Sequence, residues 1–217
     1  MKQYYYDLIV IGAGAAGMAS AVAAAQKGVK SILIVDRNQD LGGILQQCIH
    51  DGFGIHLLNK SLTGPEYAEY WKHKIKSFPI TVLINASVLE IDYKNKPFKL
   101  QILNCNEGKR QYIADAIILA TGCFEKTVGH MKIPGSRPAG IYTAGTVQYM
   151  LNIKNMSPGK TTVILGSGDI GLIMARRLTL EGIKVKLILG EKASGLARNH
   201  VQCVQDFNIP IYFNDKL

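Results

Sequence analysis

The chain has 217 residues, a mass of 23.8 kDa and a formal charge of +9, with 47% hydrophobic and 19% charged residues. This composition excludes a disordered chain, and the length suits one large domain or two small ones. No apolar run approaches the roughly 20 residues that cross a bilayer, and no signal-peptide core is seen, so we expect a cytoplasmic protein without a membrane span. The basic residues are scattered and accompany no nucleic-acid motif. The charge therefore indicates a solvated surface or anionic ligands, and no nucleic-acid partner.

The four cysteines, Cys48, Cys105, Cys123 and Cys203, lie far apart in the sequence. They form no C-x-x-C pair and no Cys/His cluster with zinc spacing. We therefore expect neither a disulfide framework nor a bound metal, which fits a reducing compartment.

The first 36 residues have the pattern of strand, glycine turn, helix and strand. The apolar run Leu8–Ile11 ends at Gly12, and small residues continue to Ala25. A second apolar run, Ser31–Val35, ends at Asp36. The pattern predicts a βαβ unit over 7–36, built on a parallel and buried sheet.

A helix and three strands are expected next. Thr63-Gly64-Pro65-Glu66 has the spacing of a capping box, so a helix should begin there and end near Ser77, before Phe78-Pro79. Strand-like segments follow at 80–93, 97–105 and 111–120, separated by polar turns. Residues 123–159 are rich in glycine and proline turns and should connect two domains.

The opening pattern then returns. When Gly12 is set on Gly166, Leu8–Ile11 aligns with Thr162–Leu165 and Gly28 aligns with Gly182, without a gap. The chain therefore contains two βαβ units of one design. We expect a first domain over 1–122, a connection over 123–159 and a second domain over 160–217.

Both turns have the sequence G-x-G-x-x-G, at 12–17 and 166–171. The first glycine permits the tight turn, the second leaves room for a pyrophosphate, and the third lets helix and strand pack closely. The alternative is a structural turn without a ligand; the flanking strands and helices favour a dinucleotide site. Asp36 ends the second strand, where a carboxylate can bind ribose hydroxyls.

The second unit has Gly190 where the first has Asp36. Glu191 follows one residue later and could bind a ribose while repelling a 2′-phosphate, whereas Lys192 or Arg198 could accept one. On this basis NAD is favoured over NADP.

The two fingerprints, together with Ala120-Thr121-Gly122 at a strand end, resemble the two-dinucleotide-binding-domain flavoproteins. That superfamily includes the pyridine nucleotide-disulfide oxidoreductases and thioredoxin reductases. Residues 41–50 and 134–145 look more narrowly like a bacterial branch of FAD/NAD(P) oxidoreductases. That branch is related to the FAD-binding subunits of amine, opine and glycerol-phosphate dehydrogenase complexes. The resemblance implies an α/β, Rossmann-like FAD/NAD(P)-binding fold, with two three-layer βα lobes and a small antiparallel β region.

The same resemblance implies FAD on the first unit and NAD or NADP on the second, with hydride transfer between nicotinamide and flavin. The FAD-binding residues would be Gly12, Ala13, Gly14, Ala15, Ala16, Gly17, Asp36, Arg37, Gly42, Gly43, Val88, Ala120, Thr121 and Gly122. The residues that bind the nicotinamide dinucleotide would be Gly166, Gly168, Asp169, Ile170, Gly171 and Glu191.

The sequence departs from that superfamily in two ways. The disulfide reductases carry paired cysteines, but here Cys48 has no nearby second thiol, so dithiol chemistry is not expected. The superfamily chain also returns to the flavin domain after the second fingerprint, whereas this sequence ends at Leu217. We therefore expect a C-terminally incomplete chain with an exposed apolar edge, which favours association with a second copy or a partner protein.

Cys48 and His50 follow Gly42-Gly43 and are the catalytic candidates; the alternative is that they pack or cap a loop. Three functions remain open. The first is an FAD-dependent NAD(P)H oxidoreductase with an unknown small-molecule electron donor or acceptor. The second is the FAD-binding subunit of an amine, imino-acid or glycerol-phosphate dehydrogenase complex. The third is a non-catalytic, truncated nucleotide-binding relative.

Overall fold

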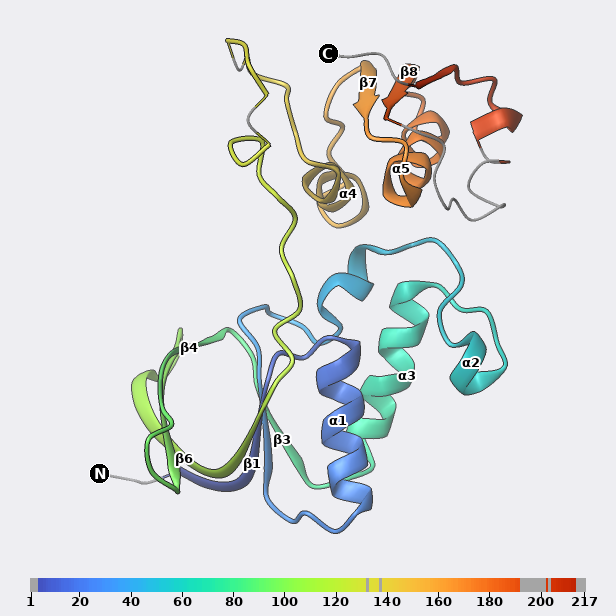
Figure 1. Ribbon diagram of the computed structural model, residues 1–217. Helices are drawn as coiled ribbons and strands as arrows, with labels where there is room; N and C mark the ends of the chain where they lie inside the picture. Colours follow the sequence, from blue (N-terminus) through green and yellow to red (C-terminus); the bar gives the residue numbers. More distant parts are fainter. Residues whose placement is uncertain (1–3, 132, 137, 192–201, 203, 214–217) are drawn as a thin grey trace. The chain divides into compact units, whose positions relative to one another are not determined.

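The computed structural model describes residues 4–131, 133–136, 138–191, 202 and 204–213 (Figure 1). The chain divides into two compact units, unit 1 over Met1–Phe124 and unit 2 over Glu125–Leu217.

Unit 1 is built on one six-stranded sheet. The strands lie in the order β3 (Ile80–Leu83), β2 (Ile32–Val35), β1 (Tyr4–Ile11), β6 (Gly108–Leu119), β5 (Phe98–Asn104) and β4 (Ala86–Asp92). The first four are parallel, and the β6–β5 and β5–β4 pairs are antiparallel. β6 belongs to both parts, because its first half pairs with β5 and its second half with β1. The expected small antiparallel region is therefore continuous with the parallel sheet.

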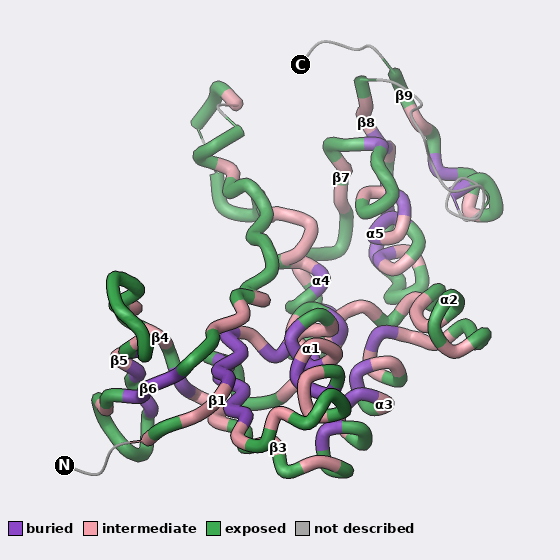
Figure 2. The backbone as a smooth tube through the Cα atoms, turned by 60° about the horizontal axis from the view of Figure 1, so that its bottom comes forward, coloured by how far each residue is buried: buried purple, intermediate pink, exposed green. Residues whose placement is uncertain are grey.

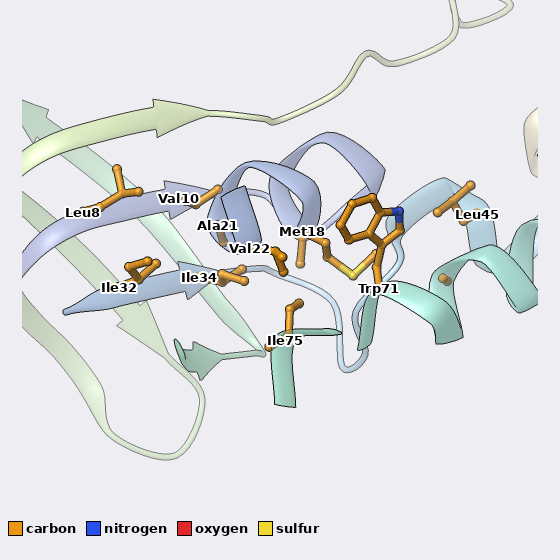
Figure 3. Close-up of a cluster of buried hydrophobic side chains, with 12 residues drawn as sticks. Leu8, Val10, Met18, Ala21, Val22, Ile32, Ile34, Leu45, Trp71 and Ile75 are labelled. Atoms are coloured by element: carbon orange, nitrogen blue, oxygen red, sulfur yellow. The ribbon is translucent and has the colours of Figure 1, made fainter. Parts of the chain in front are cut away.

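Two helices cover one face of the parallel strands. Helix α1 (Ala15–Gln26) and helix α3 (Gly64–Lys76) pack side by side on it (Figure 1). Figure 3 shows the resulting core, in which Trp71 of α3 lies beside Met18 of α1, and Ile75 of α3 lies nearer the strand residues. The short 3-10 helix η1 (Gly43–Gln47) adds Leu45 to this cluster, and α2 (Ile55–Leu58) precedes α3.

The antiparallel strands cover the other face. Ile9 of β1 and Leu33 of β2 point away from α1 and pack with Leu100 and Ile102 of β5. All four side chains are fully or almost fully buried, which gives the purple centre of the sheet in Figure 2. Unit 1 thus has the expected three layers.

The capping box at the start of α3 is confirmed. The Glu66 backbone N–H donates to Thr63 Oγ1, and the Thr63 backbone N–H donates to Glu66 Oε2 at 2.7 Å. The expected single strand over 80–93 is wrong: it divides into β3, which pairs with β2, and β4, which pairs with β5. Asn85 lies between them with a left-handed φ of 51° and ends the first strand.

Unit 2 contains a parallel sheet in the order β7 (Thr161–Leu165), β8 (Lys184–Gly190) and β9 (Ile211–Phe213). Helix α5 (Asp169–Leu180) joins β7 to β8 and packs with helix α4 (Ala144–Asn152) in one core. α4 lies within the stretch 123–159, for which the sequence predicted only a loop-rich connection.

The other face of the unit 2 sheet is exposed. Val163 and Leu165 of β7 are 52% and 50% exposed, and Tyr212 of β9 is 49% exposed. The strand register places them on one face, through the pairs Val163↔Leu187, Leu165↔Leu189 and Leu189↔Tyr212. The described residues of unit 2 therefore form two layers, where three were expected.

Candidate functional site

The glycine turn of unit 1 leaves no space for a side chain at its first and third glycines. Gly12 has a φ of 103°, and a Cβ added to it would lie 2.2 Å from the Ala120 carbonyl oxygen. A Cβ on Gly17 would lie 1.8 Å from the Gly12 carbonyl oxygen. Any larger residue at either place would push the turn away from β6 or from α1.

Gly14, the second glycine, faces open space. It is the N-cap of α1 in an extended conformation, and a Cβ built on it meets no heavy atom within 4 Å. No side chain caps this helix, and Ala15 and Ala16 put no acidic group in its first turn. Backbone N–H groups without helical partners and the positive end of the helix dipole therefore face this space, which suits a pyrophosphate.

Asp36 fastens the turn to the end of β2. The residue is 8% exposed, and its carboxylate accepts hydrogen bonds from the Ala13 N–H at 2.6 Å and the Asn38 N–H at 2.8 Å. A carboxylate has about four lone-pair sites, so two remain for further donors such as ribose hydroxyls. The same group can thus hold the loop and bind a sugar.

Gly42 and Gly43, which the resemblance puts close to the FAD pyrophosphate, lie against the glycine turn. The Gly42 N–H donates to the Ala13 carbonyl at 2.8 Å, and a Cβ on Gly43 would lie 3.3 Å from Gly14 Cα. Lys72 of α3 binds Asp40 of the preceding loop at 2.7 Å and holds this segment to the helix.

The remaining residues expected at FAD lie around the carboxyl ends of the strands or on the neighbouring β4. The Arg37 guanidinium lies 5.7 Å from the Phe124 ring centroid. Val88 is partly buried in β4, a strand that begins where the Ala86 N–H donates to the Asp36 carbonyl. Thr121 and Gly122 are exposed directly after β6. In parallel α/β sheets this end is where ligands bind.

Unit 2 repeats the main backbone contacts of the turn. The Gly166 N–H donates to the Leu189 carbonyl at 2.7 Å, as the Gly12 N–H does to the Val35 carbonyl at 2.8 Å. A Cβ on Gly171 would lie 2.1 Å from the Gly166 carbonyl oxygen, and a Cβ on Gly168 meets nothing within 4 Å. The N-cap of α5 is therefore as open as that of α1.

The first turn of α5 differs in its side chains. Asp169 puts an acidic group there, and Ile170 is exposed. Glu191 follows β8 and is exposed, while Lys192 and Arg198 lie outside the described residues.

Cys48 and His50 lie beyond η1. The Cys48 carbonyl accepts from the Gly64 N–H at 2.8 Å, and burial raises the pKa of the Cys48 thiol. His50 Nδ1 lies 3.0 Å from the Asp51 carbonyl oxygen, and its ring lies 5.2 Å from that of Phe53. These contacts favour the packing alternative, and a neutral thiol is a poor nucleophile.

One polar residue that the sequence did not single out organises unit 2. The Glu125 carboxylate accepts hydrogen bonds from the N–H groups of Gly145 and Thr146 at 2.8 and 3.1 Å, and from the Thr143 hydroxyl. It caps α4 and closes the loop before it. A glutamate twenty residues from its helix leaves no local pattern to find.

Two hollows lie away from the glycine turns. One, of about 570 Å³, lies in unit 2 at the amino ends of β8 and β9, between Ile183 and Pro210. The other, of about 190 Å³, lies between α1 and α3 beside Trp71. Parallel α/β sheets bind ligands at the carboxyl ends of their strands, so the glycine turns remain the better candidates.

The described part of the chain carries neither a metal-binding cluster nor a membrane-spanning helix. No group of three or more His, Cys, Asp or Glu side chains there could hold a metal ion. No helix in those same ranges is both long and apolar enough to cross a membrane.

Comparison with known proteins decides the family. The sequence profile of the pyridine nucleotide-disulphide oxidoreductases matches residues 6–205. The chain belongs to this family. This match confirms the resemblance expected from the fingerprints at the level of the family, which is FAD-dependent.

Relatives of this chain include subunits of complexes. It is 28% identical over 215 residues to hydrogen cyanide synthase subunit HcnB of Pseudomonas protegens, covering 96% of this chain and 43% of that protein. It is 27% identical to an opine oxidase subunit of Agrobacterium tumefaciens, covering 82% and 35%. It is 28% identical to thioredoxin reductase of Ureaplasma parvum, covering 99% and 65%. The chain thus spans less than half the length of the first two relatives.

Solved structures confirm the fold. Thioredoxin reductase of T. acidophilum matches with a TM-score of 0.71 at 24% identity, covering 97% of this chain and 64% of that one. The FAD-bound cadaverine monooxygenase DfoA of Erwinia amylovora matches with a TM-score of 0.74 at 11% identity, covering 98% and 70%. The chain therefore has the expected Rossmann-like FAD/NAD(P)-binding fold.

Proposed function

We propose that unit 1 binds FAD, that unit 2 binds NAD(P)H, and that the protein transfers hydride between the two. The observation that carries this proposal is the repeated turn: Gly12 and Gly166 make the same hydrogen bond to the next strand, and Gly14 and Gly168 face open space. Two pyrophosphate sites of one design suit a flavin and a nicotinamide dinucleotide.

The residues of unit 1 fit the adenosine diphosphate part of FAD. The open N-cap at Gly14 would receive the pyrophosphate, and Asp36 would accept hydrogen bonds from the ribose. Gly42 and Gly43 would hold the loop in place. The bound flavin supplies the capacity to accept and release a hydride, and the chain supplies binding and orientation.

The high pKa of Cys48 favours a reaction without a dithiol. Burial raises the pKa of this thiol, and the next cysteine along the chain is Cys105. We therefore place the redox chemistry on the cofactors and give Cys48 and His50 no step, although the sequence made them catalytic candidates.

An absorbance scan of the purified chain tests the proposal. We expect a flavin spectrum between about 350 and 500 nm that bleaches when NADH or NADPH is added without oxygen. Protein that stays colourless and takes up no added FAD would contradict the FAD site. A flavin spectrum that neither nucleotide bleaches would contradict the hydride transfer alone.

A second candidate follows from the names of the relatives. HcnB and the opine oxidase relative are subunits of complexes, so this chain would be the flavin-binding member of an assembly that oxidises a small amine or imino acid. It would then associate with a partner protein. Flavin bleaching by such a substrate, but not by NADH or NADPH, would favour this candidate.

A further inference from the structure

The two units differ in which of two neighbouring positions carries the larger side chain: the second residue of the glycine turn or the end of the following strand. In the ungapped repeat, Ala13 corresponds to Ser167 and Asp36 corresponds to Gly190. Unit 1 has its side chain at the strand end and almost none on the loop. Unit 2 has its side chain on the loop and none at the strand end.

The exchange in unit 2 is a close steric fit. A Cβ added to Gly190 would lie 2.0 Å from Ser167 Oγ and 2.4 Å from Ser167 Cβ. Ser167 is 6% exposed, so its side chain fills the place of any strand-end side chain. While Ser167 is present, an aspartate cannot occupy position 190 as Asp36 occupies its own place.

The chemical consequence concerns the adenosine ribose. A carboxylate at the end of this strand accepts hydrogen bonds from the ribose hydroxyls and repels a 2′-phosphate. Unit 1 has that charge in the buried Asp36, whereas unit 2 has a neutral hydroxyl there. Glu191 is exposed and one residue farther along, outside this packed position.

The charge balance of the units points the same way. Residues 125–217 contain twelve Lys and Arg against six Asp and Glu, which is most of the excess positive charge of the chain. An anionic ligand with an additional phosphate is therefore attracted to unit 2 more than to unit 1.

We propose that the Ser167–Gly190 pair admits a 2′-phosphate, so that unit 2 binds NADPH at least as tightly as NADH. This inference rests on the proposed nicotinamide site, and it replaces the preference for NAD that Glu191 suggested. The pair at 167 and 190 would set the nucleotide preference.

The test rebuilds the unit 1 pair in unit 2. Ser167→Ala/Gly190→Asp removes the steric conflict and adds the carboxylate. Binding of NAD and NADP to the full, FAD-supplied chain is measured by calorimetry, and folding is checked by circular dichroism. We expect the wild-type protein to bind NADP with a dissociation constant no larger than the one for NAD. In the double variant, the affinity for NADP relative to the affinity for NAD should fall by about tenfold or more, because the added carboxylate would repel the 2′-phosphate.

Two controls separate charge from shape. Ser167→Ala/Gly190→Asn has the same size without the charge and should leave the ratio near the wild-type value. Gly190→Asp alone retains Ser167 and should lower the melting temperature.

The outcomes are distinguishable. Wild-type protein that binds NAD but excludes NADP would overturn this inference alone, as would an unchanged ratio in the folded Asp variant. Wild-type protein that binds neither nucleotide would overturn the proposed nicotinamide site and this inference with it.

Discussion

The segments β1–α1–β2 and β7–α5–β8 have one backbone design and different surroundings. Both helices run for 12 residues from a glycine N-cap with nearly identical angles, φ −70° and −73°. Yet β1 is buried on both faces where it crosses the core, while every second residue of β7 is exposed.

The difference shows which features are local. The hydrogen bond from the first glycine and the close approach of the third form in both units, so the turn needs only its own sequence. Burial of the second sheet face depends on β4 and β5, which only unit 1 has among the described residues. A dinucleotide turn can thus be built in a sheet that is not fully covered.

The largest expected difference is between Gly12→Ala and Gly166→Ala. Both substitutions place alanine at a left-handed φ, which costs about 1–2 kcal/mol. Only Gly12 also meets a backbone oxygen, that of Ala120, so its variant should lose about 4 kcal/mol or more. Hydrogen exchange of the amides in α1 and α5 measures each unit separately.

Gly17→Ala and Gly171→Ala are the controls for that pair. Each would bring a Cβ to about 2 Å from a carbonyl oxygen, 1.8 Å in unit 1 and 2.1 Å in unit 2. Both should therefore destabilise their units severely. Equal losses for Gly12→Ala and Gly166→Ala would show that the contact with Ala120 does not matter.

The next difference is between Ile9→Ala and Val163→Ala, at equivalent places in the repeat. Ile9 is fully buried, so its truncation should cost about 3 kcal/mol, within the usual range for buried isoleucine. Val163 is 52% exposed, and its truncation should cost less than about 1 kcal/mol. Urea unfolding followed by hydrogen exchange gives both values, and similar costs would mean that the Val163 face is covered in solution.

A smaller difference is expected between Asp36→Ala and Ser167→Ala. The first variant leaves the Ala13 and Asn38 N–H groups without their carboxylate and should cost unit 1 about 2 kcal/mol. The second removes one buried hydroxyl and should cost unit 2 about 1 kcal/mol. Thermal unfolding measures the stability lost by each variant, and a larger loss for Ser167→Ala than for Asp36→Ala would contradict this prediction.

The smallest effect concerns helix ends. Thr63→Ala removes the side-chain cap of α3 and should cost about 1 kcal/mol, whereas α5 has no side-chain cap to lose. Hydrogen exchange in the first turn of α3 measures this loss, and unchanged protection there would contradict it.

The same cap makes unit 1 sensitive to acid. Hydrogen bonds from the Thr63 backbone and hydroxyl lower the pKa of Glu66. Its stabilising effect is therefore complete above the unfolded glutamate pKa of about 4.3 and is lost as pH falls through the lower folded pKa. Glu66→Gln should flatten this part of the stability curve, measured by urea unfolding at a series of acidic pH values.

The sequence predicts most of what depends on near neighbours. β2 covers Ile32–Val35, one residue shorter than the predicted run Ser31–Val35, and the Thr63–Glu66 box forms as expected. The break at Asn85 was missed because β3 and β4 are separated by their choice of partner strands, which is a non-local matter. Helix α4 was missed because Glu125 caps it from twenty residues away.

The candidate site also contains both contacts that follow from the local sequence and contacts that depend on distant strands. Contact between Gly17 and Gly12 is local and follows from the glycine spacing, whereas contact between Gly12 and Ala120 requires β6 beside β1. The repeat alignment sets Ser167 against Ala13 and Gly190 against Asp36, so the paired exchange can be seen in the sequence. Only the packed structure shows that the two residues occupy one place.

Ligand binding to Gly14→Ala and Gly168→Ala tests most directly the claim that each turn holds one dinucleotide. Neither added Cβ meets a heavy atom within 4 Å, so both variants should fold. Calorimetry with the full chain should show that Gly14→Ala weakens FAD binding by about tenfold or more and leaves the affinity for the nicotinamide dinucleotide unchanged, while Gly168→Ala does the reverse. Folded variants that bind both ligands as the wild type does would contradict the account.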